Sequence, residues 1–177
     1  MEVPRASPVW LHCKEDLLTK EKFPVTTAVR FLKENGVEFV ERPYQYEERG
    51  GTRTSAQALG VDEHLVIKTL VMEDDQKRPL IILMHGDREV STKSLARIIG
   101  AKSVTPCSPQ VALKHTGYMV GGISPFGTKK PLPIYLEETI LSLSKIFINA
   151  GRRGLLAEMS PLDLVRVLKP TPVRVAR

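Results

Sequence analysis

The sequence predicts a mixed α/β domain, in which short helices are interleaved with strands that form one curled sheet. Apolar, strand-like runs such as residues 65–72 and 80–84 are joined by polar turns. Between such runs stand short amphipathic segments that begin at a capping residue and end near a glycine. The alternation of the two patterns along 177 residues is typical of one mixed layer of strands flanked by helices.

The helices are placed by their capping residues. Thr26 or Thr27 caps the first one, which ends at residues 35–36, and Ser91 caps another that ends at Gly100. A serine followed by proline is typical of a helix start, because proline suits the first helical position. The predicted helices are therefore residues 26–35, 55–59, 91–99, 108–116 and one that starts at residue 160.

The strands are placed by alternation or by short apolar runs between turn residues. They are residues 37–41, 65–72, 80–84, 102–105, 118–120, 132–136, 145–149 and 155–159. Residues 1–24 are predicted to be an N-terminal extension, and residues 170–177 a C-terminal tail.

Composition excludes several classes of protein. With 42% hydrophobic and 26% charged residues the chain is ordinary for a globular domain. It holds no apolar run near the ~20 residues of a membrane helix and no apolar segment typical of a secretory signal. Cys13 and Cys107 are far apart in the sequence, which favours two free thiols in a reducing compartment. We therefore expect a cytoplasmic protein.

The net charge of +6 is concentrated in the last third of the chain. Residues 1–113 hold 16 Lys and Arg against 16 Asp and Glu, whereas residues 114–177 hold 10 against 4. The basic doublets there are Lys129 with Lys130 and Arg152 with Arg153. A basic face is typical of a protein with a polyanionic partner such as nucleic acid. Charge alone fits an ordinary solvated surface equally well.

The sequence contains no phosphate loop, dinucleotide fingerprint, zinc motif or nucleophile elbow. Lys68 is a different kind of candidate, because it lies inside an apolar strand pattern and shares a face with Val66 and Leu70. Such a lysine extends along the surface to water, forms an ion pair, or faces a cavity. In a cavity it would stabilise a phosphate or a developing oxyanion.

Residues 117–130 form a second candidate, because they are too long for an ordinary hairpin turn. Gly121 and Gly122 allow the backbone to approach a ligand closely, with N–H groups directed outward. Pro125 restricts the far end of the segment. Taken by itself, the segment is equally well explained as a glycine-containing turn between strands.

Four segments together resemble the family that comprises YbaK, ProX and the insertion domain of prolyl-tRNA synthetase. They are Tyr44, residues 66–70 (VIKTL), residues 116–125 (TGYMVGGISP) and residues 151–155 (GRRGL). The resemblance covers about residues 25–169. It implies a mixed, partly closed, β-barrel-like sheet flanked by helices. It also implies an aminoacyl-tRNA deacylase that acts in trans and needs no metal or other cofactor.

The resemblance implies roles for individual residues. The catalytic group is Lys68 with the backbone of Gly121 and Gly122. The substrate pocket is formed by Tyr44, Ile123, Ser124, Pro125, Asn149, Gly151 and Leu156. The basic residues Lys129, Lys130, Arg152 and Arg153 would contact the tRNA phosphates. Asn149 and Leu156 stand where the cysteine-clearing branch carries serine and aspartate, so cysteine, serine, threonine and alanine all remain candidates.

The expected partner is an aminoacyl-tRNA, foremost tRNA(Pro), with prolyl-tRNA synthetase as a further partner. We expect neither a membrane nor DNA to be bound. An alternative from another class is a module that binds tRNA or a synthetase without catalysis. A weaker alternative is a hydrolase of some other small aminoacyl ester.

Overall fold

The computed structural model describes residues 25–177, so the predicted N-terminal extension, residues 1–24, lies outside the described part. The helices in this part are α1 (Thr27–Glu34), α2 (Gly51–Leu59), α3 (Thr92–Ile99), α4 (Pro109–Thr116) and α5 (Pro161–Leu168). Two 3₁₀ turns, η1 (Glu63–Leu65) and η2 (Glu138–Ser142), join neighbouring elements. The serine caps are confirmed, since Ser91, Ser108 and Ser160 each accept a hydrogen bond from an amide of the first helical turn.

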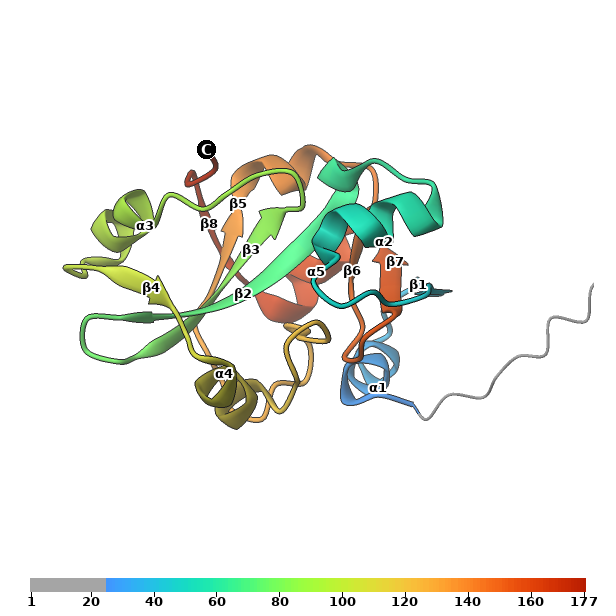
Figure 1. Ribbon diagram of the computed structural model, residues 1–177, viewed down its shortest axis with the longest axis horizontal. Coiled ribbons are helices and arrows are strands. Elements are labelled where there is room, and N and C mark those ends of the chain that lie inside the picture. Colours follow the sequence, from blue (N-terminus) through green and yellow to red (C-terminus); the bar gives the residue numbers. More distant parts are fainter. Residues whose placement is uncertain (1–24) are drawn as a thin grey trace, which may run out of the picture.

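The strands form one mixed sheet, as predicted (Figure 1). They are β1 (Phe39–Pro43), β2 (Val66–Asp74), β3 (Pro79–His85), β4 (Val104–Pro106), β5 (Ile134–Glu137), β6 (Ile146–Asn149), β7 (Leu155–Met159) and β8 (Thr171–Val173). The order is β1-β7-β6-β2-β3-β5-β8, with β4 paired to β2 beside this path. Because β1 and β8 stand at opposite ends of the order, the sheet does not close into a barrel.

Helices cover both faces of the sheet, and each face has its own apolar core. The larger core contains Ala28, Val29 and Leu32 of α1 together with residues of α4 and α5. On the other face, Leu95 and Ala96 of α3 pack over Ile82 and Met84 of β3, and Ala56 of α2 packs against Val66 and Phe147. No helix in residues 25–177 is long and apolar enough to cross a bilayer.

The prediction of a C-terminal tail was wrong for residues 171–173, which form β8 and pair in parallel with β5. The chain continues along Val90, which forms a bridge with Ala176. The buried carboxylate of Glu137 accepts hydrogen bonds from the amides of Val175 (2.7 Å) and Ala176 (2.8 Å). The C-terminal segment is therefore part of the domain.

The predicted strand at residues 118–120 was also wrong, because these residues form a loop that pairs with no strand. We call residues 117–130 the glycine loop. Phe126 anchors it: the ring is fully buried and stacks on Phe31 of α1, with 6.0 Å between ring centroids. The Tyr118 hydroxyl donates to the Phe126 carbonyl oxygen at 2.6 Å, and burial raises the pKa of Tyr118 to about 12. The loop therefore has an apolar interior of its own.

Candidate functional site

A cavity of about 630 Å³ lies beside the middle of β2. Its walls come from β2, the segment after β1, the start of α2, the residues between β4 and α4, and the glycine loop. Of the residues predicted for the site, the ones that line it are Tyr44, Lys68, Gly121, Ile123, Asn149, Arg153 and Leu156. These residues, far apart in the sequence, thus meet in one place.

The other predicted residues lie outside the cavity wall. Gly122, Ser124 and Pro125 are buried, and the Ser124 hydroxyl accepts a hydrogen bond from the Phe126 amide at 3.3 Å. Gly151 and Arg152 belong to the turn that supports the glycine loop. Lys129 and Lys130 are exposed at the end of that loop, and their amides donate to the carbonyl oxygens of Thr116 and His115. This second group is therefore placed to support the site or to present charge around it.

Lys68 enters the cavity from β2 and is half-buried. Its ammonium donates a hydrogen bond to the carbonyl oxygen of Arg88. Burial lowers the pKa of Lys68, and the carboxylates of Glu63, Glu89 and Asp87 partly oppose this shift. A lysine whose charge is incompletely solvated is suited to interact strongly with an anionic or partly negative ligand atom.

The tip of the glycine loop is fixed by the turn after β6. The Asn149 side-chain amide donates to the Gly121 carbonyl at 3.0 Å, and the Arg153 side chain donates to the Val120 carbonyl at 2.9 Å. The Arg153 guanidinium also lies over the Tyr46 ring, 5.1 Å from its centroid. Asn149 and Arg153 therefore hold the loop backbone against the cavity while lining the cavity themselves.

The two adjacent glycines are required by close packing. A Cβ atom on Gly121, whose φ is +89°, would lie 2.7 Å from the Tyr46 hydroxyl oxygen. A Cβ on Gly122 would lie 3.0 Å from backbone atoms of Arg152 and Arg153. The Gly122 amide already donates to the Met119 carbonyl at 2.9 Å, whereas within residues 25–177 the amides of Gly121 and Ile123 donate no hydrogen bond. Because Gly121 and Ile123 line the cavity, their amides are candidates to bind a ligand carbonyl, as is that of Val120.

Cys107 lies in the cavity wall, where a thiol nucleophile would be expected if the chemistry used one. Burial raises the pKa of Cys107 to about 11, with a further contribution from the Glu73 carboxylate. Because the thiolate is the reactive form, this thiol is a poor nucleophile at neutral pH. The side chain acts instead as a small apolar surface.

His64, His85 and Asp87 form a group of potential metal ligands next to Lys68, with ligand atoms within 4.8 Å of one another. The two imidazole rings stack, with centroids 3.7 Å apart and planes inclined by 11°, so their in-plane lone pairs run side by side instead of converging. The Nδ1 atoms bind Asp87 and the His64 carbonyl oxygen, and His85 Nε2 binds Thr139, each at 2.8 Å. The arrangement is a hydrogen-bonded network in which these nitrogens are already engaged.

The sequence analysis did not identify several residues of the cavity wall. Tyr46 and Thr52 are two of them. Tyr46 could have been predicted from the sequence, because it follows Tyr44 at the two-residue spacing that places side chains on one face of an extended chain. Thr69 gave no signal beyond its position beside Lys68. Its hydroxyl is buried and has no hydrogen-bond partner within residues 25–177. A buried group of this kind costs about 1–3 kcal/mol when it stays unpaired.

A family model described as "Aminoacyl-tRNA editing domain" matches residues 48–167, a range that includes most of the cavity wall. The chain belongs to this editing-domain family. The resemblance found in the sequence is thereby confirmed, and with it the YbaK-like character of the domain. What the family name describes is an editing activity on aminoacyl-tRNA.

Among curated relatives, EbsC of Enterococcus faecalis is 32% identical over 137 residues, which covers 77% of this chain and 84% of EbsC. Its name describes it as a candidate Cys-tRNA(Pro)/Cys-tRNA(Cys) deacylase. The proline–tRNA ligase of Thermodesulfovibrio yellowstonii is 33% identical over 82 residues, or 46% of this chain and 14% of the ligase. The editing domain is thus similar both to a small separate protein and to a segment of a synthetase.

Solved structures show the same fold. A structure described as a candidate trans-editing enzyme for prolyl-tRNA synthetase superposes with a TM-score of 0.74 at 23% identity, covering 85% of this chain and 97% of that one. A hypothetical protein, APE2540, gives a TM-score of 0.78 at 24% identity and covers 85% of this chain and 99% of that one. At these identities the likeness supports the fold of the editing domain alone.

Proposed function

We propose that this editing domain is a trans-acting hydrolase that removes a small, wrongly attached amino acid from tRNA, foremost from tRNA(Pro). The observation that carries the proposal is the meeting of Lys68, the Gly121 and Ile123 amides and Tyr44 around one cavity in a chain of the editing family. The similarity to EbsC and to part of a proline–tRNA ligase supports the choice of tRNA(Pro) and of prolyl-tRNA synthetase as partners.

The chemistry needs positioning more than a protein nucleophile. An aminoacyl ester is already activated by its α-ammonium group and by the vicinal ribose hydroxyl. Water attacks the carbonyl carbon, the ester C–O bond breaks, and the ribose oxygen takes up a proton as it leaves. The substrate's own thiol can take the place of water for a cysteinyl ester. Positioning and oxyanion stabilisation together account for large accelerations of such steps.

The chain supplies the two stabilising groups from two parts of the cavity wall, β2 and the glycine loop. The amides of Gly121 and Ile123 would hold the carbonyl oxygen, and Lys68 would stabilise negative charge that develops on it. The Cys107 thiol stays protonated and takes no part as a nucleophile. We propose that no metal is needed, because the engaged nitrogens of His64 and His85 leave the lysine and the amides as the electrophilic groups.

The proposal is tested by deacylation of a panel of charged tRNAs. The panel contains Cys-, Ser-, Thr- and Ala-tRNA(Pro), with cognate Pro-tRNA(Pro) as the control for selectivity. We expect at least one of the first four to be hydrolysed much faster than in buffer, with many turnovers per enzyme and with Pro-tRNA(Pro) spared. A module that only binds tRNA would protect the ester, so protection without turnover would establish the alternative function.

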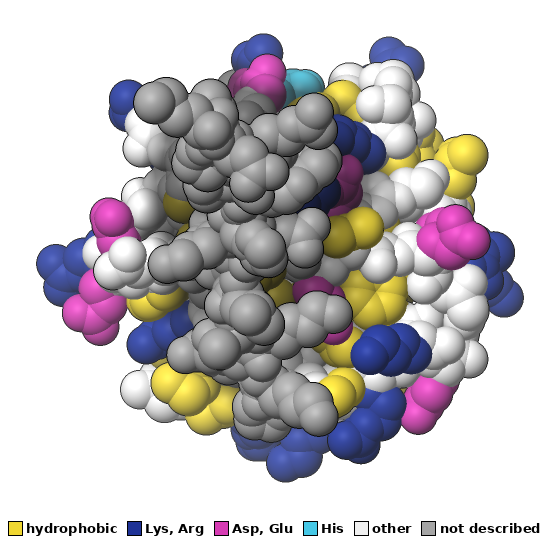
Figure 2. Space-filling model, turned by 90° about the vertical axis from the view of Figure 1, so that its right-hand side faces the viewer, with side chains coloured by type: hydrophobic (Ala, Val, Ile, Leu, Met, Phe, Trp, Pro, Cys, Tyr) yellow, Lys and Arg dark blue, Asp and Glu magenta, His cyan; other side chains and the backbone are white. Residues whose placement is uncertain are grey.

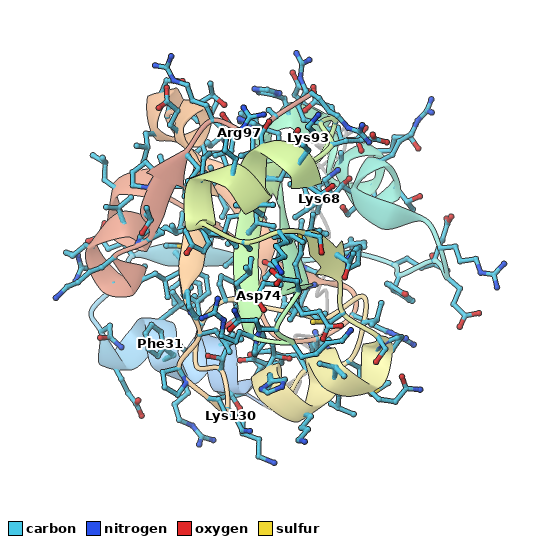
Figure 3. All side chains as sticks on the ribbon, turned by 90° about the vertical axis from the view of Figure 1, so that its left-hand side faces the viewer. Phe31, Lys68, Asp74, Lys93, Arg97 and Lys130 are labelled. Carbon is cyan, nitrogen blue, oxygen red and sulfur yellow. The ribbon has the colours of Figure 1, made fainter. Side chains whose placement is uncertain are left out.

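Two exposed basic surfaces are candidates for tRNA contact. Lys129 and Lys130 stand at the end of the glycine loop. Lys93 and Arg97 of α3, with Lys102, border a groove of about 450 Å³ between α3 and β4. Figure 3 shows Lys93 and Arg97 toward one end of a face and Lys130 at the other, with Lys68 between them. None of these five side chains forms an ion pair within residues 25–177.

On the face at the β1 end, by contrast, Lys and Arg stand interspersed with Asp and Glu around the rim (Figure 2). We therefore propose that the phosphates lie along the glycine-loop surface, where Lys129 and Lys130 extend the basic rim formed by Arg152 and Arg153. Arg153 lines the cavity itself, so this surface leads directly into it.

Charge reversal distinguishes the two surfaces. The double variant Lys129→Glu with Lys130→Glu should weaken tRNA binding and flatten the dependence of log Kd on log salt by about 1.4 to 1.8, since each lost phosphate contact removes roughly 0.7–0.9 from the slope. The matched control is Lys93→Glu with Arg97→Glu, which changes the charge equally. Binding measured by fluorescence anisotropy at several salt concentrations gives both slopes. A flattened slope in the control alone would place the RNA on the α3 surface.

A further inference from the structure

One edge of β2 is open over its central residues. On one side β2 pairs with β3 along almost its whole length. On the other side it pairs with β6 through Val66 and Ile67 and with β4 through residues 72–74. No strand in residues 25–177 pairs with the intervening residues 68–71 on that side, and all four line the cavity. The cavity is therefore a gap in the sheet, between the end of β6 and the end of β4.

The hydrogen-bond alternation of the ladder fixes which backbone groups face this gap. Along an antiparallel strand the N–H and C=O groups of one residue point to one neighbour, and those of the next residue point to the other. The Val71 carbonyl oxygen faces away from β3, because it accepts the Cys107 amide at 3.0 Å. Thr69, two residues earlier, must therefore direct both its N–H and its C=O into the gap.

Nothing in the described chain occupies these groups. Within residues 25–177, no side chain hydrogen-bonds to the backbone of Thr69, and no loop amide or carbonyl does so. The Thr69 hydroxyl is also buried without a partner. The hydroxyls of Thr52 and Ser55, also in the cavity wall, have partners: Thr52 binds Glu63 at 2.8 Å, and Ser55 binds the Thr52 carbonyl at 2.9 Å. The N–H and C=O groups of Thr69 thus face the gap unpaired, and its buried hydroxyl has no partner either.

We infer that the open edge of β2 binds the aminoacyl group as a one-residue antiparallel strand paired with Thr69. This inference rests on the proposed function and names the subsite that holds the amino acid. The α-ammonium would donate to the Thr69 carbonyl oxygen. The Thr69 amide would donate to the ester carbonyl oxygen in the bound substrate, beside the glycine-loop and Lys68 donors proposed above. These are the two hydrogen bonds that directly opposite residues exchange in an antiparallel pair.

The pairing has two consequences for specificity. Residues directly opposite each other in a pair project their side chains from the same face, within about 5.5 Å of one another. The substrate side chain would therefore lie on the same face as the Thr69 side chain. A rotation about the Thr69 Cα–Cβ bond would bring its buried, unpaired hydroxyl within reach of a serine hydroxyl or a cysteine thiol. Proline is disfavoured, because its ring fixes the direction of the two N–H groups on its ammonium and places a ring carbon beside the partner strand.

The experiment measures kcat/KM for Ser-, Ala- and Pro-tRNA(Pro) with the wild-type chain and with Thr69→Val and Thr69→Ser. Valine keeps the shape and the β preference of threonine but lacks the hydroxyl, whereas serine keeps the hydroxyl. We expect Thr69→Val to lower the ratio of Ser-tRNA to Ala-tRNA hydrolysis about 3- to 10-fold, the effect of one neutral hydrogen bond. Thr69→Ser should restore the ratio. The wild-type chain should prefer Ala-tRNA to Pro-tRNA by at least about 10-fold.

A purely structural role for Thr69 would change hydrolysis of all substrates in proportion, because a shared loss of folded protein leaves their ratio unchanged. An unchanged Ser-to-Ala ratio in Thr69→Val, or equal hydrolysis of Ala- and Pro-tRNA by the wild-type chain, would overturn the inference. An unchanged Ser-to-Ala ratio leaves the proposed function intact, because the wild-type chain still hydrolyses its esters. Equal hydrolysis of Ala- and Pro-tRNA(Pro) would also contradict the selectivity expected of the proposed function. Absence of hydrolysis of every ester by the wild-type chain would instead reject the proposed function.

Discussion

Replacing Lys68 by alanine is expected to lower kcat for deacylation by about 100- to 1,000-fold, the usual cost of removing one electrostatic group from an oxyanion site. The reason is the position of Lys68 in the cavity wall, where burial lowers its pKa and its charge is incompletely solvated. Single-turnover hydrolysis of the best ester in the panel measures the effect. Measuring KM for the wild-type chain and for Lys68→Ala separates two roles of the lysine. If Lys68 only anchors a substrate phosphate, its removal should raise KM and leave kcat unchanged.

The controls for Lys68 test the charge and the fold. Lys68→Arg keeps the cation and should retain more activity than Lys68→Ala. Lys145→Ala removes a lysine beside β6 whose amine pairs with Glu158 at 3.0 Å outside the cavity, and it should leave the rate within about twofold, as for surface pairs of this kind. The melting temperature of Lys68→Ala should fall by no more than about 4 °C, the shift for ~1 kcal/mol in a domain of this size. More than a third of wild-type activity in Lys68→Ala would exclude the assigned role.

Local sequence patterns predicted most helices and strands, because capping residues and apolar periodicity act between residues that are near in the sequence. The serine caps of α3, α4 and α5 each act within one turn of the helix. The strand predicted at residues 118–120 failed for a non-local reason: Tyr118 is buried in the glycine loop, Met119 and Val120 are exposed, and no strand in residues 25–177 pairs with them. β8 was missed because Pro172 argues against a strand, although an edge position such as β8 tolerates proline.

The site was predictable only where residues carry the family motif. Lys68 and the glycine pair stand out in the sequence, and the structure brings Lys68 and Gly121 to one cavity. Thr69 does not stand out, because its importance depends on the gap between β6 and β4 along β2. That gap is set by the order of strands far apart in the chain. A residue within a motif can thus face the site through its backbone although its own role is not evident from the sequence.

Replacing Phe126 by alanine is expected to lower the free energy of unfolding by about 3–5 kcal/mol, as for other large aromatic core residues. The ring is 0% exposed and packs on Phe31, so its loss leaves a cavity under the glycine loop. Urea denaturation followed by circular dichroism measures the change. Leu162→Ala provides the control: this side chain is 70% exposed, and its removal should cost less than about 0.5 kcal/mol.

The Phe126 variant also tests whether the packed interior of the glycine loop holds the Gly121 and Ile123 amides in position. The Phe126 carbonyl holds the Tyr118 hydroxyl, and the loop tip is tied separately by Asn149 and Arg153. If packing sets the position of the Gly121 and Ile123 amides, the folded fraction of Phe126→Ala should deacylate more slowly than wild type at low temperature. Phe126→Leu fills more of the space and should recover both stability and rate. A stable Phe126→Ala, within about 1 kcal/mol of wild type, would show that the ties to Asn149 and Arg153 suffice to build the loop.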